Sequence, residues 1–259
     1  MSSHLLACTD QGDGPPLVLL HGFPLSRKMW DVAVKSWSQN FRVIAPDFRG
    51  FGDSPMSEGE FSIAGCAEDV VDLVSSLGIQ QKIVLLGLSM GGYVCFEFVR
   101  KYQEMLRSLI LVGTQPAADS DASRQARYET AEFVRREGSS ALAEKLIPRF
   151  LGKTTLASKP GVVETVRALI QSNSPGAIAQ ACYGLASRRD STSFLSEVNI
   201  PTLIVAGSED GLIPSAQADT MQHEIGDSQL VVVENCGHLI NLEQPNVLNQ
   251  VVTDFLRSR

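Results

Sequence analysis

The fold of this chain is decided by residues 82–100, which read KIVLLGLSMGGYVCFEFVR. Residues 82–86 are mostly apolar and β-branched, which predicts a short buried strand, and residues 93–100 continue without a breaker, which predicts a buried helix. Ser89 lies between them, in the pattern Gly-x-Ser-x-Gly. Only glycine lets the chain pass closely on both sides of so sharp a turn. The sequence therefore predicts that the Ser89 hydroxyl projects from the edge of a sheet, at the N-terminal end of a helix.

Short apolar segments alternate with longer helical patterns along most of the chain, which is typical of parallel strands joined by helices. Strands are predicted at Leu17–Leu20, Arg42–Ala45, Ile83–Leu86, Ser108–Val112, Thr202–Ala206 and Leu230–Val233. Helices are predicted at Arg27–Ser38, Ser62–Ser76, Met90–Tyr102, Ser215–Ile225 and Pro245–Leu256. The first twenty residues leave room for at most a short antiparallel hairpin. The predicted fold class is α/β, with a mostly parallel central sheet flanked by helices.

The alternation of strands and helices fails between about residues 114 and 200. This span contains no convincing strand, but it contains helical patterns at Arg124–Arg136, Ala141–Leu151, Val162–Ser172 and Ala177–Ser187. Glycine and proline residues between these patterns mark turns, and no Gly- or Ser-rich linker bounds the span. We therefore expect residues 114–200 to form a helical cap, or lid, inserted into a core domain made of residues 1–113 and 201–259.

Composition and charge narrow the classes of partner. The chain has 259 residues, of which 44% are hydrophobic and 20% charged, and its net charge is −7. Nucleic-acid binding is not expected, because phosphate contacts need clustered lysine and arginine. No apolar run approaches the roughly 20 residues of a membrane span, and residues 1–10 lack the features of a signal peptide. The five scattered cysteines are expected to be reduced. We expect a cytoplasmic protein with no nucleic-acid or membrane partner, and the sequence predicts no oligomeric state.

Two loops supply the groups that a nucleophilic serine requires, a base to take its proton and a group to orient that base. Asp210 follows the predicted strand Thr202–Ala206, and His238 follows the predicted strand Leu230–Val233. The carboxyl ends of parallel strands lie along one edge of a sheet, where Ser89 is also expected. Asp210 and His238 are therefore the predicted partners of Ser89.

Both partners have competitors in the sequence. Glu209, beside Asp210, is a second candidate for the acid, and Asp210 is also a plausible turn residue. The remaining histidines compete with His238 for the role of the base: His4, His21 and His223. His4 lies near the terminus and His223 lies among polar residues of a predicted helix, so neither is assigned a role.

The chain resembles the α/β-hydrolase superfamily at five motifs, in the order and spacing of that family. They are His21-Gly22-Phe23-Pro24, the loop Asp47–Ser54, Gly87–Gly91, Gly207–Asp210 and Gly237-His238. The motifs extend from about residue 17 to the C-terminus and leave only the cap unmatched. The resemblance implies that Ser89 is the nucleophile, Asp210 the acid and His238 the base. The family pattern Gly-x-x-Asp fits Asp210 and not Glu209.

Stabilising an oxyanion needs two backbone N–H groups aimed at one point. Met90, the residue after the nucleophile, supplies one from the N-terminus of the predicted helix. The other is expected from the loop after Leu17–Leu20, where Pro24 has no N–H and the resemblance implies Phe23. The predicted chemistry is a two-step acyl transfer that needs no metal and no organic cofactor.

The resemblance implies a serine hydrolase that cleaves small carboxylic esters or lactones, similar to small esterases and 3-oxoadipate enol-lactonases. An enol-lactone hydrolase is the first alternative, and a perhydrolase (haloperoxidase-like) or a carbon–carbon bond hydrolase would use the same residues. The serine argues against dehalogenases and epoxide hydrolases, which use a carboxylate at that position. A ligand-binding signalling receptor of the same fold is an alternative of another class.

A lactonase for an anionic substrate would need a positive group in its pocket. The cap offers only arginines of unassigned orientation as candidates: Arg124, Arg127, Arg135, Arg136, Arg149, Arg167, Arg188 and Arg189. Amphipathic helices carry such residues on solvated faces, so most of them are expected to face solvent.

The loop Asp47–Ser54 is expected to form one wall near the site. Glycines and a proline in and beside it favour turns. Arg49 and Asp53 are expected to pair with each other, and neither is assigned a catalytic role.

Overall fold

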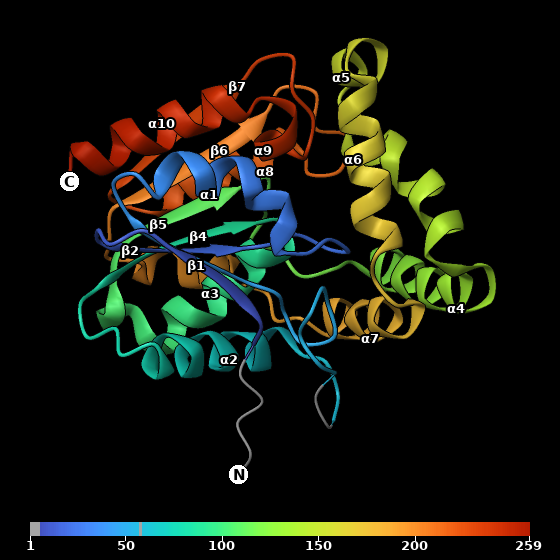
Figure 1. Ribbon diagram of the computed structural model, residues 1–259, viewed down its shortest axis with the longest axis horizontal. Coiled ribbons are helices and arrows are strands. Elements are labelled where there is room, and N and C mark those ends of the chain that lie inside the picture. The colour runs from blue at the N-terminus through green and yellow to red at the C-terminus, as the bar shows by residue number, and fades with distance from the viewer. Residues whose placement is uncertain (1–5, 57–58) are drawn as a thin grey trace.

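A seven-stranded sheet forms the centre of the molecule (Figure 1). The structure, a computed structural model, describes residues 6–56 and 59–259, so His4 and the start of the N-terminal segment lie outside the described residues. The strands are β1 (Cys8–Gln11), β2 (Pro16–Leu20), β3 (Arg42–Pro46), β4 (Ile83–Leu88), β5 (Leu106–Val112), β6 (Thr202–Gly207) and β7 (Ser228–Val233). Their order is β1-β3-β2-β4-β5-β6-β7, and all neighbours are parallel except β1 and β3. The predicted α/β class with a mostly parallel sheet is confirmed.

Helices cover both faces of this sheet, which explains why β2 and β4 are buried along their whole length. The flanking helices are α1 (Asp31–Trp37), α2 (Ile63–Ser76), α3 (Met90–Tyr102), α8 (Ser215–Glu224), α9 (Ile240–Glu243) and α10 (Pro245–Arg257). Successive residues of a strand point to opposite faces. Leu85 of β4 therefore belongs to a core with α2, α3 and α8, whereas Leu86 belongs to a core with α1 and α10.

Apart from α9, which the sequence does not predict, the flanking helices begin and end close to their predicted bounds. The prediction for Arg27–Ser38 is the least accurate, because a 3-10 turn (Arg27–Trp30) precedes α1 there. At the start of α2, the side chain of Ser62 accepts a hydrogen bond from the Gly65 N–H at 3.0 Å, which satisfies a free donor of the first turn. The capping hydrogen bond of Ser62 thus starts α2 within one residue of its predicted beginning.

The antiparallel segment at the start of the chain is not a hairpin with the strand that follows it. β1 pairs with β3, with Cys8 opposite Pro46, and not with β2. Both edges of β2 are occupied by parallel neighbours, β3 on one side and β4 on the other. The outer edge of β3 is therefore the edge that β1 covers.

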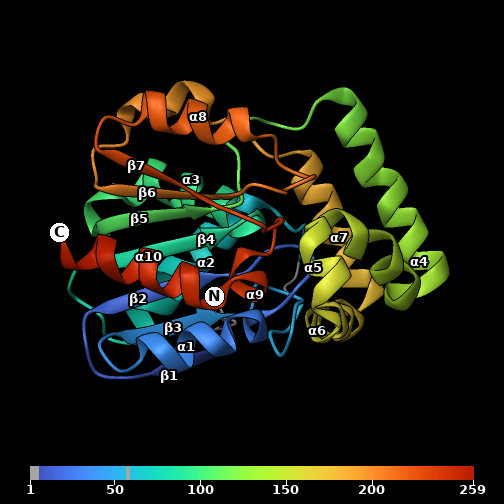
Figure 2. The same cartoon turned by 90° about the horizontal axis from the view of Figure 1, so that it is seen from above.

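The chain between β5 and β6 forms helices that gather beyond the carboxyl ends of the parallel strands, as two perpendicular views show (Figures 1 and 2). They are α4 (Asp121–Phe150), α5 (Lys153–Ser158), α6 (Pro160–Gln171) and α7 (Pro175–Ala186). The segment that contains them, residues 114–200, is called the cap below, and the rest of the chain is called the core. A 3-10 turn (Thr192–Glu197) leads back into β6. Within α4 the backbone leaves helical geometry at Gly138, where φ is 83°. That break separates two helical segments, in agreement with the separate patterns at 124–136 and 141–151.

No helix within residues 6–56 and 59–259 is both long enough and apolar enough to cross a membrane.

Candidate active site

Ser89 stands between the end of β4 and the start of α3. Its φ of 53° and ψ of −112° are rare for a residue with a side chain and store about 1–3 kcal/mol of strain. A Cβ atom at Gly87 would overlap the carbonyl group of Gly91, and one at Gly91 would overlap the carbonyl group of Leu20. The Ser89 N–H donates to the Val112 carbonyl of β5 at 2.9 Å. Close packing on both sides therefore holds this serine in its strained conformation at the edge of the sheet.

Asp210 and His238 are bonded to each other in the loops after β6 and β7. Oδ2 of Asp210 lies 2.9 Å from Nδ1 of His238, and both side chains are almost fully buried. Oδ1 accepts hydrogen bonds from the N–H groups of Leu212 and Ile213 at 2.8 and 3.0 Å. Burial alone would raise the pKa of Asp210, but His238 and these two amide groups outweigh it and hold that pKa below its usual value. An ionised Asp210 fixes the proton on Nδ1 and leaves Nε2 of His238 free to act as a base.

The segment after β5 brings the serine and the histidine to the same point. Val112 accepts from the Ser89 N–H, and the Thr114 hydroxyl donates to the Ser89 carbonyl at 2.9 Å. Gly113 lies between them, and a Cβ atom there would be 3.3 Å from Nδ1 of His238. Within the described residues, no hydrogen bond joins the Ser89 hydroxyl to His238. Such bonds are often long in unliganded sites and shorten when substrate binds.

Phe23 and Met90, the two expected oxyanion donors, both line a cavity at Ser89. Met90 is the first residue of α3. The loop of Phe23 passes so close that a Cβ atom at Gly22 would lie 3.5 Å from Cβ of Ser89. In the described part of the chain, neither the Phe23 N–H nor the Met90 N–H donates a backbone hydrogen bond. Both groups are therefore available to an oxyanion.

The competing histidines have other surroundings. His21 is completely buried, and burial lowers its pKa to about 4. Its Nδ1 contacts the Gly22 carbonyl at 3.0 Å, and its Nε2 accepts from the Phe48 N–H at 3.0 Å. Both ring nitrogens of His21 thus hold the loops of the site in place. The side chain of His223 is 85% exposed, on α8.

Glu209, the competing acid, binds the cap helix α5 and not the histidine. Its carboxylate accepts from the Thr154 N–H at 2.8 Å and from the Thr154 hydroxyl at 2.7 Å. These two bonds lower the pKa of Glu209. Of the two neighbouring carboxylates, only Asp210 is within hydrogen-bond distance of His238.

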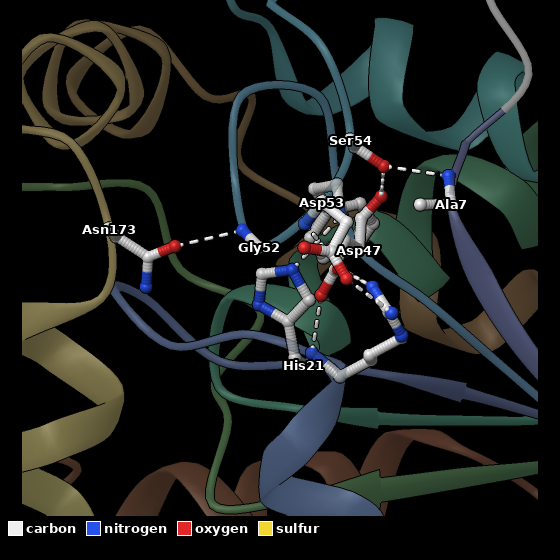
Figure 3. A network of polar contacts seen from close by, with 9 residues as sticks. Ala7, His21, Asp47, Gly52, Asp53, Ser54 and Asn173 are labelled. Atoms are coloured by element: carbon white, nitrogen blue, oxygen red, sulfur yellow. Dashed lines mark hydrogen bonds and ion pairs between the residues drawn. The ribbon is translucent and has the colours of Figure 1, made fainter.

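The predicted Arg49–Asp53 pair does not form. Arg49 makes a bidentate pair with Asp69 of α2, at 2.7 and 2.6 Å. Asp53 pairs with Arg27 at 2.6 Å, and Arg27 also pairs with the fully buried Asp47 (Figure 3). The two ends of the loop face different partners that are distant in sequence, so spacing within the loop is a poor guide to its pairing.

The cap is bonded to the loop that carries the candidate base. The backbone N–H of His238 donates to the carbonyl of Phe150, the last residue of α4, at 2.9 Å. The buried carboxylate of Glu243 accepts from Gly152 in the cap at 2.9 Å and from Gly237 in the core at 3.0 Å. The position of His238 therefore depends on the end of a cap helix.

Asn173, between α6 and α7, joins the cap to the loops on the opposite side of the site. Its side-chain amide donates to the carbonyl of Pro24 at 2.9 Å and to that of Leu169 at 3.0 Å. Its side-chain oxygen accepts from the Gly52 N–H at 2.9 Å (Figure 3). The residue is 3% exposed. A single buried asparagine thus ties the cap to the segment that carries Phe23.

A cavity of about 180 Å³ opens at Ser89 and is lined by residues of both core and cap. Phe23 and Met90 line it, as do the cap residues Asp119 and Arg127. Of the eight cap arginines, Arg127 and Arg149 line it. Asp119 belongs to no motif and follows no periodic pattern, so the sequence carries no signal for its position in the cavity.

Several known proteins are similar to this chain in sequence. The sequence matches the family described as alpha/beta hydrolase fold over residues 15–245. It is 28% identical to 3-oxoadipate enol-lactonase 2 of Acinetobacter baylyi, over 95% of this chain and 90% of that protein. It is 31% identical to a soluble epoxide hydrolase of a Corynebacterium species, over 94% of this chain and 91% of that protein.

A solved structure resembles the molecule over nearly its whole length. It is that of a thermophilic esterase from Thermogutta terrifontis with malate bound. It has 42% sequence identity and a TM-score of 0.94, and the match covers 98% of this chain and 93% of the esterase. The match extends across the cap as well as the sheet.

Proposed function

The chain belongs to the α/β-hydrolase fold family, and we propose that it hydrolyses small carboxylic esters or lactones through an acyl-enzyme on Ser89. One observation carries this proposal: the bonded Asp210–His238 pair lies against the segment that also holds the strained Ser89. A nucleophile, a base and a group that orients the base are the components that acyl transfer requires.

In the first step, the Ser89 oxygen attacks the carbonyl carbon of the substrate while Nε2 of His238 takes the serine proton. Asp210 keeps the other ring nitrogen protonated and stabilises the imidazolium that forms. The tetrahedral intermediate then expels the alcohol or enol oxygen, which receives the proton from His238. In the second step, water attacks the acyl group by the same route, which releases the acid and restores the Ser89 hydroxyl.

The negative charge of each tetrahedral intermediate falls on the former carbonyl oxygen. The N–H groups of Phe23 and Met90 are our candidates for its donors, because both flank Ser89 and neither is used in a backbone hydrogen bond within the described residues. Donors fixed in place before the reaction stabilise this charge without reorganising.

We further propose that residues 114–200 act as a cap on a core made of residues 1–113 and 201–259. The cap supplies Arg127 and Phe150 to the cavity wall, while the core supplies Ser89 and Met90. A site closed on one side by an inserted segment excludes water and sets the size of the substrate.

An ester or lactone is favoured over an epoxide as the substrate. The nucleophile position holds serine, which forms an acyl-enzyme with a carbonyl compound, and not the carboxylate that the sequence resemblance associates with epoxide hydrolases. Similarity to an enol-lactonase and to an esterase supports a carbonyl substrate. Enol-lactone hydrolysis is the second candidate, because the leaving enol would take its proton from His238 as an alcohol does.

Replacing the nucleophile tests this proposal. We expect Ser89→Ala to abolish hydrolysis of p-nitrophenyl acetate and butyrate, and of a panel of alkyl esters and lactones. Activity near that of the unmodified protein would remove Ser89 from the mechanism. Thermal stabilisation by panel compounds that are never hydrolysed would favour a ligand-binding receptor instead.

A further inference from the structure

One charged cluster in the wall of the cavity has no part in the proposed acyl transfer. Asp119 lies between two arginines of the cap, with Oδ1 2.6 Å from Arg188 and Oδ2 3.1 Å from Nε of Arg127. The side chains of Asp119 and Arg188 are each 3% exposed, whereas that of Arg127 is 27% exposed. The cluster therefore has a buried part and an accessible part.

The buried part makes further contacts inside the protein. Arg188 also donates to the carbonyls of Leu185 and Ala117, at 3.2 and 2.9 Å, and its guanidinium lies 4.3 Å from the ring of Tyr93. Because one carboxylate lies between two guanidinium groups, the cluster keeps a net positive charge. Burial and these contacts together hold the Asp119–Arg188 pair in place.

The accessible part faces the site. Arg127 lines the cavity together with Ser89, and its guanidinium lies 6.0 Å from the ring of Phe23. Its Nε is held by Asp119, and within the described residues its two terminal NH₂ groups make no hydrogen bond. A guanidinium fixed at Nε presents these two groups as a fork, a shape that matches a carboxylate.

The wall of the cavity carries a net positive charge. Its charged lining residues within the described chain are Asp119, Arg127 and Arg149, and Asp119 is the one already paired with buried Arg188. Arg149, exposed at the end of α4, adds a second positive charge. Although the net charge of the protein is −7, the wall of its candidate active site is thus positively charged.

We propose that Arg127 is an anion-binding residue that selects substrates carrying an ionised carboxylate in addition to the ester or lactone group. The Asp119–Arg188 pair positions Arg127 and touches no substrate itself. This inference rests on the proposed function, since it concerns the same cavity. It predicts a preference for half-esters of dicarboxylic acids, or for esters of hydroxy acids, over uncharged compounds of equal size.

The test compares esters that carry a carboxylate with esters of the same shape in which a neutral amide replaces that carboxylate. Monoethyl succinate and ethyl succinamate place the charge on the acyl side, and O-acetylglycolate and O-acetylglycolamide place it on the leaving group. The ratio of kcat/KM for the charged and uncharged member of each pair is measured in a pH-stat. We expect Arg127→Gln to lower that ratio about tenfold or more in at least one pair, because a charge-assisted hydrogen bond is lost.

Arg124→Gln is the matched control, since Arg124 lies one turn earlier on α4, pairs with Asp121 and is exposed. It removes the same charge from the same helix, and we expect it to keep the ratio. The ratio cancels the fraction of active enzyme, so partial unfolding of a variant does not affect it, and Arg127→Lys should give an intermediate value. A ratio in Arg127→Gln within about twofold of the unmodified protein in both pairs would overturn the inference. Failure of the unmodified protein to cleave any of the four compounds would instead count against the proposed function.

Discussion

At the scale of single residues, the bond between Asp210 and His238 determines which imidazole nitrogen is left free to act as a base. The 2.9 Å contact occupies Nδ1 of the imidazole, so in the proposed mechanism Nε2 is the nitrogen that takes a proton from Ser89. Two backbone amide groups hold the other oxygen of Asp210. The acid is thereby fixed in place before any substrate binds.

Replacing Asp210 by asparagine should slow the proposed reaction strongly and leave the fold intact. We expect Asp210→Asn to lower kcat by about 10³-fold or more, because an amide permits the wrong imidazole tautomer. Glu209→Gln makes the same chemical change one residue earlier, where the carboxylate binds Thr154. Steady-state kinetics on a p-nitrophenyl ester would refute the assignment if the Glu209 variant were the more impaired of the two.

The buried imidazole of His21 should make the unfolding free energy depend on pH. Burial lowers its pKa from 6.5 to about 4, so folded His21 stays neutral while the unfolded chain takes up a proton below about pH 6.5. The contribution of neutral His21 to the unfolding free energy is therefore complete above about pH 6.5 and is lost as the pH falls towards 4. Between pH 7 and pH 4.5 the loss should be about 2–3 kcal/mol.

Urea unfolding at several pH values measures this loss. The variant His21→Gln retains an acceptor for the Phe48 N–H but has no proton to gain. We therefore expect its unfolding free energy to depend less steeply on pH over this range. Parallel pH profiles for the variant and the unmodified protein would show that His21 does not titrate as described.

At the scale of elements, the cap is bonded to both sides of the site. Phe150, at the end of α4, accepts from the backbone of His238. Asn173, between α6 and α7, donates to Pro24 beside the candidate oxyanion donor Phe23. The cap helices thus contact His238 and the loop of Phe23 through separate hydrogen bonds.

Loss of the Asn173 amide should therefore affect stability and catalysis together. Asn173→Ala leaves the Pro24 carbonyl and the Gly52 N–H without their partner, at a cost of about 2–4 kcal/mol in unfolding free energy. Because Phe23 is free to shift, we expect kcat to fall about tenfold with little change in KM. Asn199→Ala, at an exposed asparagine, is the control and should alter neither quantity. A change in stability with kcat intact would limit Asn173 to a structural role.

The elements that the sequence predicts well are those with local signals. Gly87–Gly91 and the loops of Asp210 and His238 follow apolar strands directly, and each is recognisable within a few residues. The pairing of β1 with β3 and of Arg49 with Asp69 depends on segments far apart in the chain. Asp119 and Arg188 come together from the two ends of the cap, which no periodicity in the sequence indicates.

At the scale of the whole molecule, hydrogen bonds at Phe150, Gly152 and Asn173 join the cap to the core. We expect them to unfold as one unit. Both tryptophans, Trp30 and Trp37, lie in the core beside β2 and β3, whereas far-UV circular dichroism also reports the helices of the cap. Urea transitions followed by fluorescence and by circular dichroism should coincide. A loss of ellipticity before the change in fluorescence would mean that the cap unfolds on its own.

The central claim is that Ser89 is a nucleophile activated by its partners. The most direct measurement is treatment with a p-nitrophenyl alkylphosphonate, followed by peptide mass mapping. The account predicts one adduct, on the peptide that contains Ser89, formed rapidly in the unmodified protein and much more slowly in Asp210→Asn. Labelling of another residue, or labelling of Ser89 at equal rates in both proteins, would contradict it.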